Sequence, residues 1–238
     1  MEYSFKSEDL ESRTAAEILY WAAKTFGSKL ALTSSFQTQS LPLLHLVSKI
    51  CPNVPVFFLD TGFHFKETIE FRNQLKRELG INIVTLLPLC GHEDFIENHG
   101  ELHQTNQNMC CYMNKVEPLQ RALAGYDAWI SGVRRDQTEA RKNTPVIAMQ
   151  NNGLYKVCPM VRWTQDDVTH YIKRFGLPEH PLSTQGYRSI GCAPCTKPTL
   201  VGQDPRVGRW VGSEKTECGL HFNPTTGAAV RINSQSSD

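Results

Sequence analysis

The chain has 238 residues, of which 40% are hydrophobic, which is enough for one sizeable core. Its formal net charge is +1, so overall charge favours neither nucleic acid nor an anionic membrane surface as a partner. No apolar run approaches the roughly 20 residues needed to cross a bilayer, and residues 1–10 lack the basic and apolar stretches of a signal peptide. We therefore expect a cytoplasmic protein whose eight cysteines stay reduced, which favours metal binding or catalysis over disulfides.

Amphipathic stretches alternate with short apolar runs along the chain. The first predicted helix, over 14–26, has a capping box of Thr14 and Glu17 and ends at Gly27. The pattern predicts further helices over 41–50, 65–79, about 109–123 and 164–175, and strands over 30–35, 54–59, 81–87 and 128–132. Such alternation predicts right-handed βαβ units, and hence an α/β fold with a mainly parallel sheet flanked by helices.

Ligands of such sheets bind at the carboxyl ends of the strands, so the loops there are candidate sites. Hydroxyls and backbone N–H groups at the start of a helix can hold an anion or form an ordinary helix cap. The first such loop consists of Ser34, Ser35, Phe36 and Gln37. Asp60 and Gly62 follow the second strand, where the carboxylate can accept from a ribose hydroxyl or close a tight turn.

Arginines gather after the fourth predicted strand. Arg134, Arg135 and Arg141 lie within ten residues of its end, and guanidinium forks match phosphate and sulfate groups. A solvated charge run is the alternative. The position at a ligand-binding edge favours anion binding.

Cysteines form two close pairs, Cys110 with Cys111 and Cys192 with Cys195. Adjacent side chains diverge and converge poorly on one small ion, but they can bind two different irons of one cluster. A structural zinc site stays an alternative. Lys115 follows Cys111 by one helical turn, which places it near both the metal centre and an anionic substrate.

Cys218 stands apart from the other cysteines, near the C-terminus. His221 follows it, Gly219 gives the segment a hinge, and Arg206 and Arg209 precede it. Nearby positive charge lowers the pKa of a thiol and favours the reactive thiolate. An inert thiol is the alternative, and we favour a nucleophile.

The chain resembles the adenylyl-sulfate and phosphoadenylyl-sulfate reductases of assimilatory sulfur metabolism. The matching segments are SSFQTQS, LDTGFHFKET, CCYMNKVEPL, GVRRDQTEAR, IGCAPCT and ECGLH, in family order from about residue 30 to 222. Two departures stand out. Gln37 and Thr38 replace the usual Gly-Ile of relatives, and Tyr112 to Asn114 replace a segment that often carries arginine.

The resemblance implies a fold like that of the adenine nucleotide α-hydrolases, with a modified pyrophosphate loop at Ser34 to Gln37. It implies one 4Fe–4S cluster on Cys110, Cys111, Cys192 and Cys195, a feature of the branch that typically uses adenosine 5′-phosphosulfate (APS). It implies that Lys115 links cluster and substrate, with His221 beside the nucleophile Cys218. The phosphosulfate-binding arginines of the family fall at Arg141, Arg206 and Arg209, with Arg134 and Arg135 as alternatives to Arg141.

These implications predict a thioredoxin-dependent reductase that converts APS to sulfite and AMP through an S-sulfocysteine on Cys218. We expect one nucleotide-binding and cluster domain over 1–213 and a tail over 214–238 that carries the nucleophile. The alternatives are reduction of the 3′-phosphorylated substrate (PAPS), or a non-catalytic iron–sulfur module that senses redox state. An ATP-pyrophosphatase would need glycines and an aspartate that SSFQTQS lacks. The oligomeric state, monomer or homo-oligomer, stays open.

Overall fold

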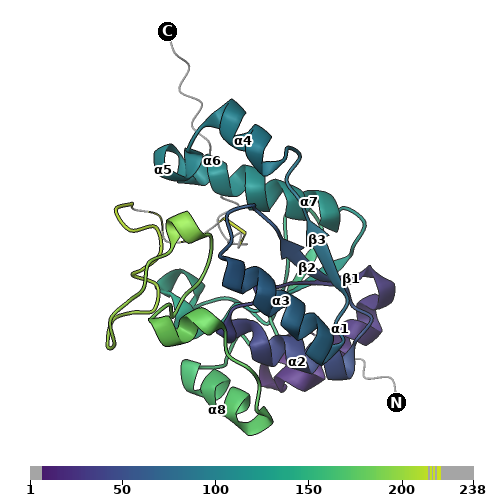
Figure 1. Cartoon of the computed structure of the whole chain (residues 1–238). Coiled ribbons are helices and arrows are strands. Elements are labelled where there is room, and N and C mark those ends of the chain that lie inside the picture. Colours follow the sequence, from purple (N-terminus) through teal and green to yellow (C-terminus); the bar gives the residue numbers. More distant parts are fainter. Residues whose placement is uncertain (1–6, 214, 216, 218, 221–238) are drawn as a thin grey trace.

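The computed structural model describes residues 7–213, 215, 217, 219 and 220 (Figure 1). Within these residues six strands form one sheet in the order β3-β2-β1-β4-β6-β5. All neighbours pair in parallel except β5, which runs antiparallel to β6 at the edge. The strands are β1 (Leu30–Thr33), β2 (Val56–Leu59), β3 (Ile83–Leu86), β4 (Ala128–Ser131), β5 (Ile147–Met149) and β6 (Tyr155–Val157). The predicted mainly parallel α/β fold is confirmed.

The chain reverses its direction of travel across the sheet at β1. It moves outward from β1 to β2 and β3, then returns to β4 on the other side of β1. Leu32 pairs with Val56 on one side and with Ile130 on the other. The carboxyl ends of β1 and β4 therefore form the switch point where ligands of open α/β sheets bind.

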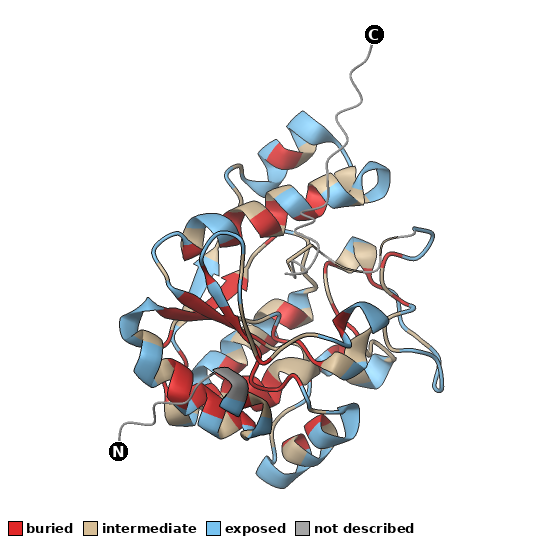
Figure 2. Cartoon of the chain, turned by 180° about the vertical axis from the view of Figure 1, so that it is seen from behind, coloured by how far each residue is buried: buried red, intermediate tan, exposed pale blue. Residues whose placement is uncertain are grey.

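Helices cover both faces of the sheet (Figure 1). The large core cluster joins one face to α1 (Ala15–Phe26), α2 (Leu41–Ile50), α3 (Lys66–Leu79) and α8 (Gln165–Phe175). A smaller cluster on the opposite face packs Ala31, Phe57 and Trp129 against α7 (Glu117–Leu123). Alternate residues of the central strands β1, β2 and β4 thus enter opposite cores. Figure 2 shows these central strands as buried and the helices as buried along their inner sides, whereas the edge strands β3 and β5 are partly exposed.

The predicted helix boundaries hold where the sequence carries capping signals. Thr14 and Glu17 form the expected capping box before α1, and Thr164 and Asp167 form another before α8. Gly80 and Gly176 end their helices in the left-handed conformation. No helix in the described part of the chain is long and apolar enough to cross a membrane.

The helix expected over about 109–123 is not continuous. It consists of α6 (Gln107–Cys111), a π-helical turn over Tyr112–Val116, and α7. Pro118 lacks an N–H, and its ring would crowd the carbonyl of Asn114 in a regular helix, so a wider turn relieves both problems. Two short helices, α4 (His92–His99) and α5 (Leu102–Thr105), precede it and were not predicted, and neither were β5 and β6.

Candidate functional site

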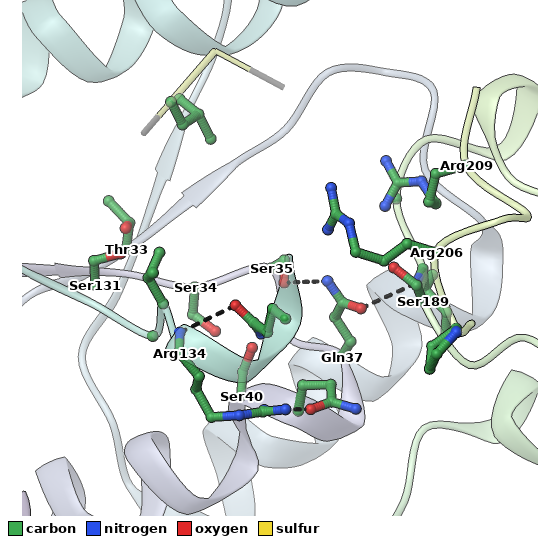
Figure 3. Close-up of a pocket in the computed structure, with 18 of the residues that line it drawn as sticks. Thr33, Ser34, Ser35, Gln37, Ser40, Ser131, Arg134, Ser189, Arg206 and Arg209 are labelled. Atoms are coloured by element: carbon green, nitrogen blue, oxygen red, sulfur yellow. Dashed lines mark hydrogen bonds between the residues drawn. The ribbon is translucent and has the colours of Figure 1, made fainter. Parts of the chain in front are cut away.

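A cavity of about 340 Å³ opens at the carboxyl ends of β1 and β4. Figure 3 shows Thr33, Ser34 and Ser35 on one wall and Ser189, Arg206 and Arg209 on the other, with Gln37 between them. Of the predicted binding residues, the cavity is lined by Ser34, Ser35, Gln37, Lys115, Arg141, Arg206 and Arg209. Segments more than 150 residues apart in the sequence therefore meet here, as the position of the switch point predicts.

The first loop turns sharply at Phe36. Its φ is +55°, and its side chain is fully buried against Phe58, with ring centroids 5.6 Å apart. Phe36 was predicted as a binding residue, but its ring lies in the core and does not line the cavity. The Ser34 hydroxyl accepts a hydrogen bond from the Phe36 N–H at 3.1 Å, which stabilises the turn. The buried ring thus fixes a loop whose neighbouring hydroxyls line the cavity.

Gln37 and Thr38, the residues that depart from the family pattern, join this loop to the segment that carries Cys192. The side-chain Oε1 of Gln37 accepts from the Ile190 N–H at 2.9 Å, and its side-chain Nε2 donates to the Ser35 hydroxyl at 2.9 Å (Figure 3). The Thr38 hydroxyl accepts from the His180 N–H at 3.1 Å. Gln37 therefore links the two walls of the cavity, and Thr38 ties the loop to His180 outside the cavity.

The turn after β2 is built as a structural element. An Asp60 oxygen accepts from the Gly62 N–H at 3.1 Å, and the carboxylate lies 4.0 Å from Arg72. Gly62 has a φ of +73°, and a Cβ there would lie 2.6 Å from the His92 ring. Neither Asp60 nor Gly62 lines the large cavity. The geometry favours the tight turn over the ribose contact that was its alternative.

His64 is a cavity residue that the sequence interpretation missed, although it lies within the LDTGFHFKET motif. Its Nε2 is 2.8 Å from the Leu59 carbonyl, so Nε2 carries the proton and donates. Its Nδ1 is buried and finds no partner among the described residues. Burial lowers the pKa of His64, so the ring presents a neutral acceptor.

The arginines after β4 separate into different environments. Arg135 pairs with Glu11 at 2.9 Å and does not line the cavity. Arg134 lines it, but its side chain is only 3% exposed and its guanidinium is held by Asp136 at 2.9 Å. Arg141 is also buried, and its Nε donates to the Glu217 carboxylate at 2.8 Å. Arg135 is thus a structural residue, whereas Arg141 presents its fork at the cavity.

Arg209 lies on the opposite wall, in a segment without helix or strand. Its guanidinium carbon is 4.6 Å from the centre of the Trp210 ring, which is buried. Its Nε is buried and makes no hydrogen bond to any group that the structure describes. An arginine donor held by ring stacking and left unsatisfied at a cavity wall is suited to an anionic ligand.

The two cysteine pairs meet beside this cavity. Cys110 and Cys111 end α6, Cys192 precedes the short 3₁₀ turn Ala193–Cys195, and Cys195 is the last residue of that turn. Backbone contacts position this turn. His64 and Cys192 pair in an isolated antiparallel β-bridge, and the Ala193 N–H donates to the Phe63 carbonyl at 2.7 Å. All four cysteines line a second, much smaller cavity, and Lys115 and Cys192 line both cavities.

Four thiols in one buried place repel each other as thiolates. Burial, with the charges of the neighbouring cysteines, raises the pKa of Cys110 to about 12 and raises the pKa of Cys195. Burial would also raise the pKa of Cys192, but Lys115 and the Thr61 hydroxyl outweigh it and bring that pKa below its ordinary value. In the described part of the chain, no three His, Cys, Asp or Glu side chains converge as they would around a single metal ion. These four thiolates are therefore better suited to bind the separate irons of an iron–sulfur cluster than to bind one metal ion.

The predicted nucleophile Cys218 and its neighbour His221 lie outside the described residues. Glu217 and Leu220, which flank Cys218 in the sequence, line the large cavity. Leu220 also packs against the smaller core cluster. The described residues on either side of Cys218 therefore reach this site.

Comparison with known proteins agrees with the site. The model of the phosphoadenosine phosphosulfate reductase domain matches residues 29–198. The chain is 46% identical over 215 residues to the adenosine 5′-phosphosulfate reductase of Streptomyces coelicolor, covering 90% of each protein. It is 43% identical to adenosine 5′-phosphosulfate reductase 1 of Bacillus subtilis, covering 90% of this chain and 93% of that protein.

Solved structures show the same fold. The phosphoadenylyl-sulfate reductase of Candida auris, in a phosphate complex, has a TM-score of 0.71 and 30% identity, covering 80% of this chain and 94% of that one. The FMN adenylyltransferase of Candida glabrata has 13% identity and a TM-score of 0.56, and the match covers 83% of this chain and 67% of that one. This second likeness concerns the fold alone. The chain therefore belongs to the phosphoadenosine phosphosulfate reductase domain family.

Proposed function

We propose that this protein is an adenylyl-sulfate reductase that converts APS to sulfite and AMP in sulfate assimilation. One observation carries the proposal: Lys115 and Cys192 line both the arginine-walled cavity and the smaller cavity of the four cysteines. The relatives named for APS reduction are 43–46% identical, whereas the solved PAPS reductase is 30% identical, which favours APS over PAPS.

The substrate occupies the large cavity. Its adenine and ribose lie over the ends of β1 and β2, where Ser34, Ser35 and the neutral His64 offer polar contacts. Its phosphosulfate is held by Lys115 and by three arginines, which are Arg141, Arg206 and Arg209. Donors fixed in place before the reaction lose little free energy to reorganisation when charge develops.

Cys110, Cys111, Cys192 and Cys195 hold one 4Fe–4S cluster. A bound cluster would link α6 to the turn at Cys192, and its irons would stabilise the thiolates, which burial and the neighbouring cysteines otherwise disfavour by raising the pKa values of Cys110 and Cys195. Lys115 lies one turn beyond Cys111 and lowers the pKa of Cys192 through its charge. This chain's own part is to orient Lys115 between the cysteines and the substrate anion.

Cys218 performs the chemistry from the tail. Its thiolate attacks the sulfur of APS, a bond between the two sulfur atoms forms, and the bond from sulfur to the phosphate oxygen breaks as AMP leaves. A thioredoxin thiolate then attacks Cys218 Sγ and releases sulfite. The second thioredoxin thiol resolves the mixed disulfide, so the dithiol supplies the two electrons that reduce the sulfur. His221 assists beside the nucleophile, residues 1–213 form the binding domain, and 214–238 form the tail of this cytoplasmic enzyme.

The test is an anaerobic purification, followed by iron and acid-labile sulfide analysis and by turnover of APS and PAPS with thioredoxin. We expect four irons and four sulfides per chain, faster turnover of APS, and no turnover by Cys218→Ser despite unchanged APS binding. Zinc in place of iron, or turnover by the Cys218→Ser variant, would overturn the proposal. Faster turnover of PAPS would assign the chain to the other substrate.

A further inference from the structure

Glu217, the residue before Cys218, sits among the arginines of the large cavity. Arg141 donates to both of its carboxylate oxygens, with distances of 2.8 Å from Nε and 2.5 Å from Nη2. Arg206 Nη2 lies 3.5 Å from one oxygen, and the Thr138 hydroxyl donates to the other at 3.2 Å. Arginine binds both carboxylates and phosphates in this bidentate geometry.

The pair is shielded from water. The Arg141 side chain is 10% exposed and the Glu217 side chain 21%. The other acidic residues that line the cavity engage different groups, because Asp136 holds Arg134 and Asp204 accepts from the backbone N–H of Arg206. Within the described residues, Glu217 is therefore the carboxylate that occupies the side-chain donors of Arg141 and Arg206.

A substrate anion and Glu217 need the same donors. The phosphosulfate is negative, and the Arg141 nitrogens that point to Glu217 cannot bind both anions at full strength. Among the described residues, Glu217 forms ion pairs with Arg141 and Arg206 but not with Arg209, whose Nε stays unsatisfied. The substrate can thus meet Arg209 at once, but reaches Arg141 by displacing Glu217.

The segment around Glu217 has weaker attachments on either side. Lys215 Nζ lies 2.5 Å from the Asn108 side-chain oxygen and 5.7 Å from the centre of the Trp210 ring. Leu220 packs on the edge of the smaller core cluster. The contact of Lys215 with Asn108 is exposed and contributes little, so the shielded ion pair of Glu217 with Arg141 dominates the polar contacts that attach this segment.

We propose that Glu217 is an internal competitor for the substrate anion. Its carboxylate docks on Arg141 and Arg206 in the empty enzyme, and the phosphosulfate of the nucleotide displaces it. Binding therefore frees the segment that carries Cys218 as it fills the site. The inference rests on the proposed function, because it takes the phosphosulfate as the competing anion.

The first test is the affinity for APS in a Cys218→Ser background, where no turnover occurs. If the docked form outnumbers the undocked form by about ten to one, Glu217→Gln tightens APS binding by about tenfold, since the apparent Kd scales with the competent fraction. The matched control is Glu139→Gln, because Glu139 lies near Arg141 in the sequence but is 86% exposed and pairs with Lys142. An unchanged or weaker affinity in the Glu217→Gln variant would overturn the competition.

Tryptic cleavage after Lys215 gives a readout without activity. In the Cys218→Ser protein we expect slow cleavage without nucleotide and faster cleavage with saturating APS. Adding Glu217→Gln is expected to make cleavage fast even without APS, whereas Glu139→Gln leaves the rate unchanged. Protection by APS, or equal rates with and without the Glu217 charge, would contradict displacement.

The two proposals fail in different ways. If APS binds to none of these variants, both the proposed function and this inference fall. If APS binds tightly but its affinity is the same with and without Glu217→Gln, only the inference about Glu217 fails.

Discussion

Gly191 gives Arg209 its place in the cavity wall. A Cβ at Gly191 would lie 2.2 Å from Arg209 Nη2 and 2.5 Å from its guanidinium carbon. The backbone of Gly191 is not in the left-handed region, so alanine fits its conformation. The Gly191→Ala substitution therefore acts through the guanidinium, which must move away from its position beside Trp210.

The size of the effect follows from what Arg209 offers the substrate. A hydrogen bond to a charged group contributes about 1.5–3 kcal/mol, and each 1.4 kcal/mol is about a factor of ten in binding. We expect Gly191→Ala to weaken APS binding by about ten- to a hundredfold, with little change in thermal stability. Gly125→Ala is the matched control, because a Cβ at Gly125 would meet no atom within 4 Å.

The assay is calorimetric APS binding to four proteins in the Cys218→Ser background: the parent, Gly191→Ala, Arg209→Ala and the double variant. If Gly191 acts through Arg209, Gly191→Ala costs almost nothing once Arg209 is absent, which is the coupling that a double-mutant cycle measures. An equal loss in both backgrounds, or a Gly191→Ala protein that binds like its parent, would show that Gly191 does not act through Arg209.

Three further predictions concern the fold and the metal centre. Phe36→Ala is expected to lower the free energy of unfolding by about 3–5 kcal/mol in denaturant titrations, because the ring is fully buried, and a loss below about 1 kcal/mol would contradict its core role. The Leu182 N–H donates to His180 Nδ1 at 3.2 Å, and burial lowers the pKa of His180 to about 4. Between pH 6.5 and 4, His180 therefore binds a proton in the unfolded chain but stays neutral in the folded protein. Stability should then fall by up to about 3 kcal/mol over that window, and a His180→Gln protein with the same pH profile would disprove this. Cys111→Ser is expected to lose iron and acid-labile sulfide while keeping its circular dichroism, and full iron content would exclude Cys111 as a ligand.

The sequence predicted the elements that carry local signals. The bounds 41–50 match α2 because Pro42 sits in its first turn, and the capping boxes fixed the starts of α1 and α8. The hairpin of β5 and β6 was missed, although Asn152 and Gly153 form a turn dipeptide typical of hairpins. Gly153 has a φ of +80°, but three-residue strands show too little alternation to be recognised.

The site was harder to predict, because its members are sorted by long-range partners. No local pattern distinguishes Arg135 from Arg141. In the structure Arg135 pairs with Glu11, which is 124 residues away in the sequence, whereas Arg141 pairs with Glu217. The same holds for Phe36, whose loop position suggested a ligand contact until packing against Phe58 placed its ring in the core. Residue type predicted the kinds of chemistry, and packing selects which residues carry them out.

The most direct test of the account is whether Cys218 accepts the sulfonate group of APS. The protein is incubated with APS without any reductant, and its intact mass, the modified peptide and the released AMP are measured. If Cys218 is the nucleophile, we expect one sulfonate group on Cys218, an equal amount of AMP, and sulfite only after thioredoxin is added. Release of sulfite without an adduct, or a sulfonate on another residue, would contradict it.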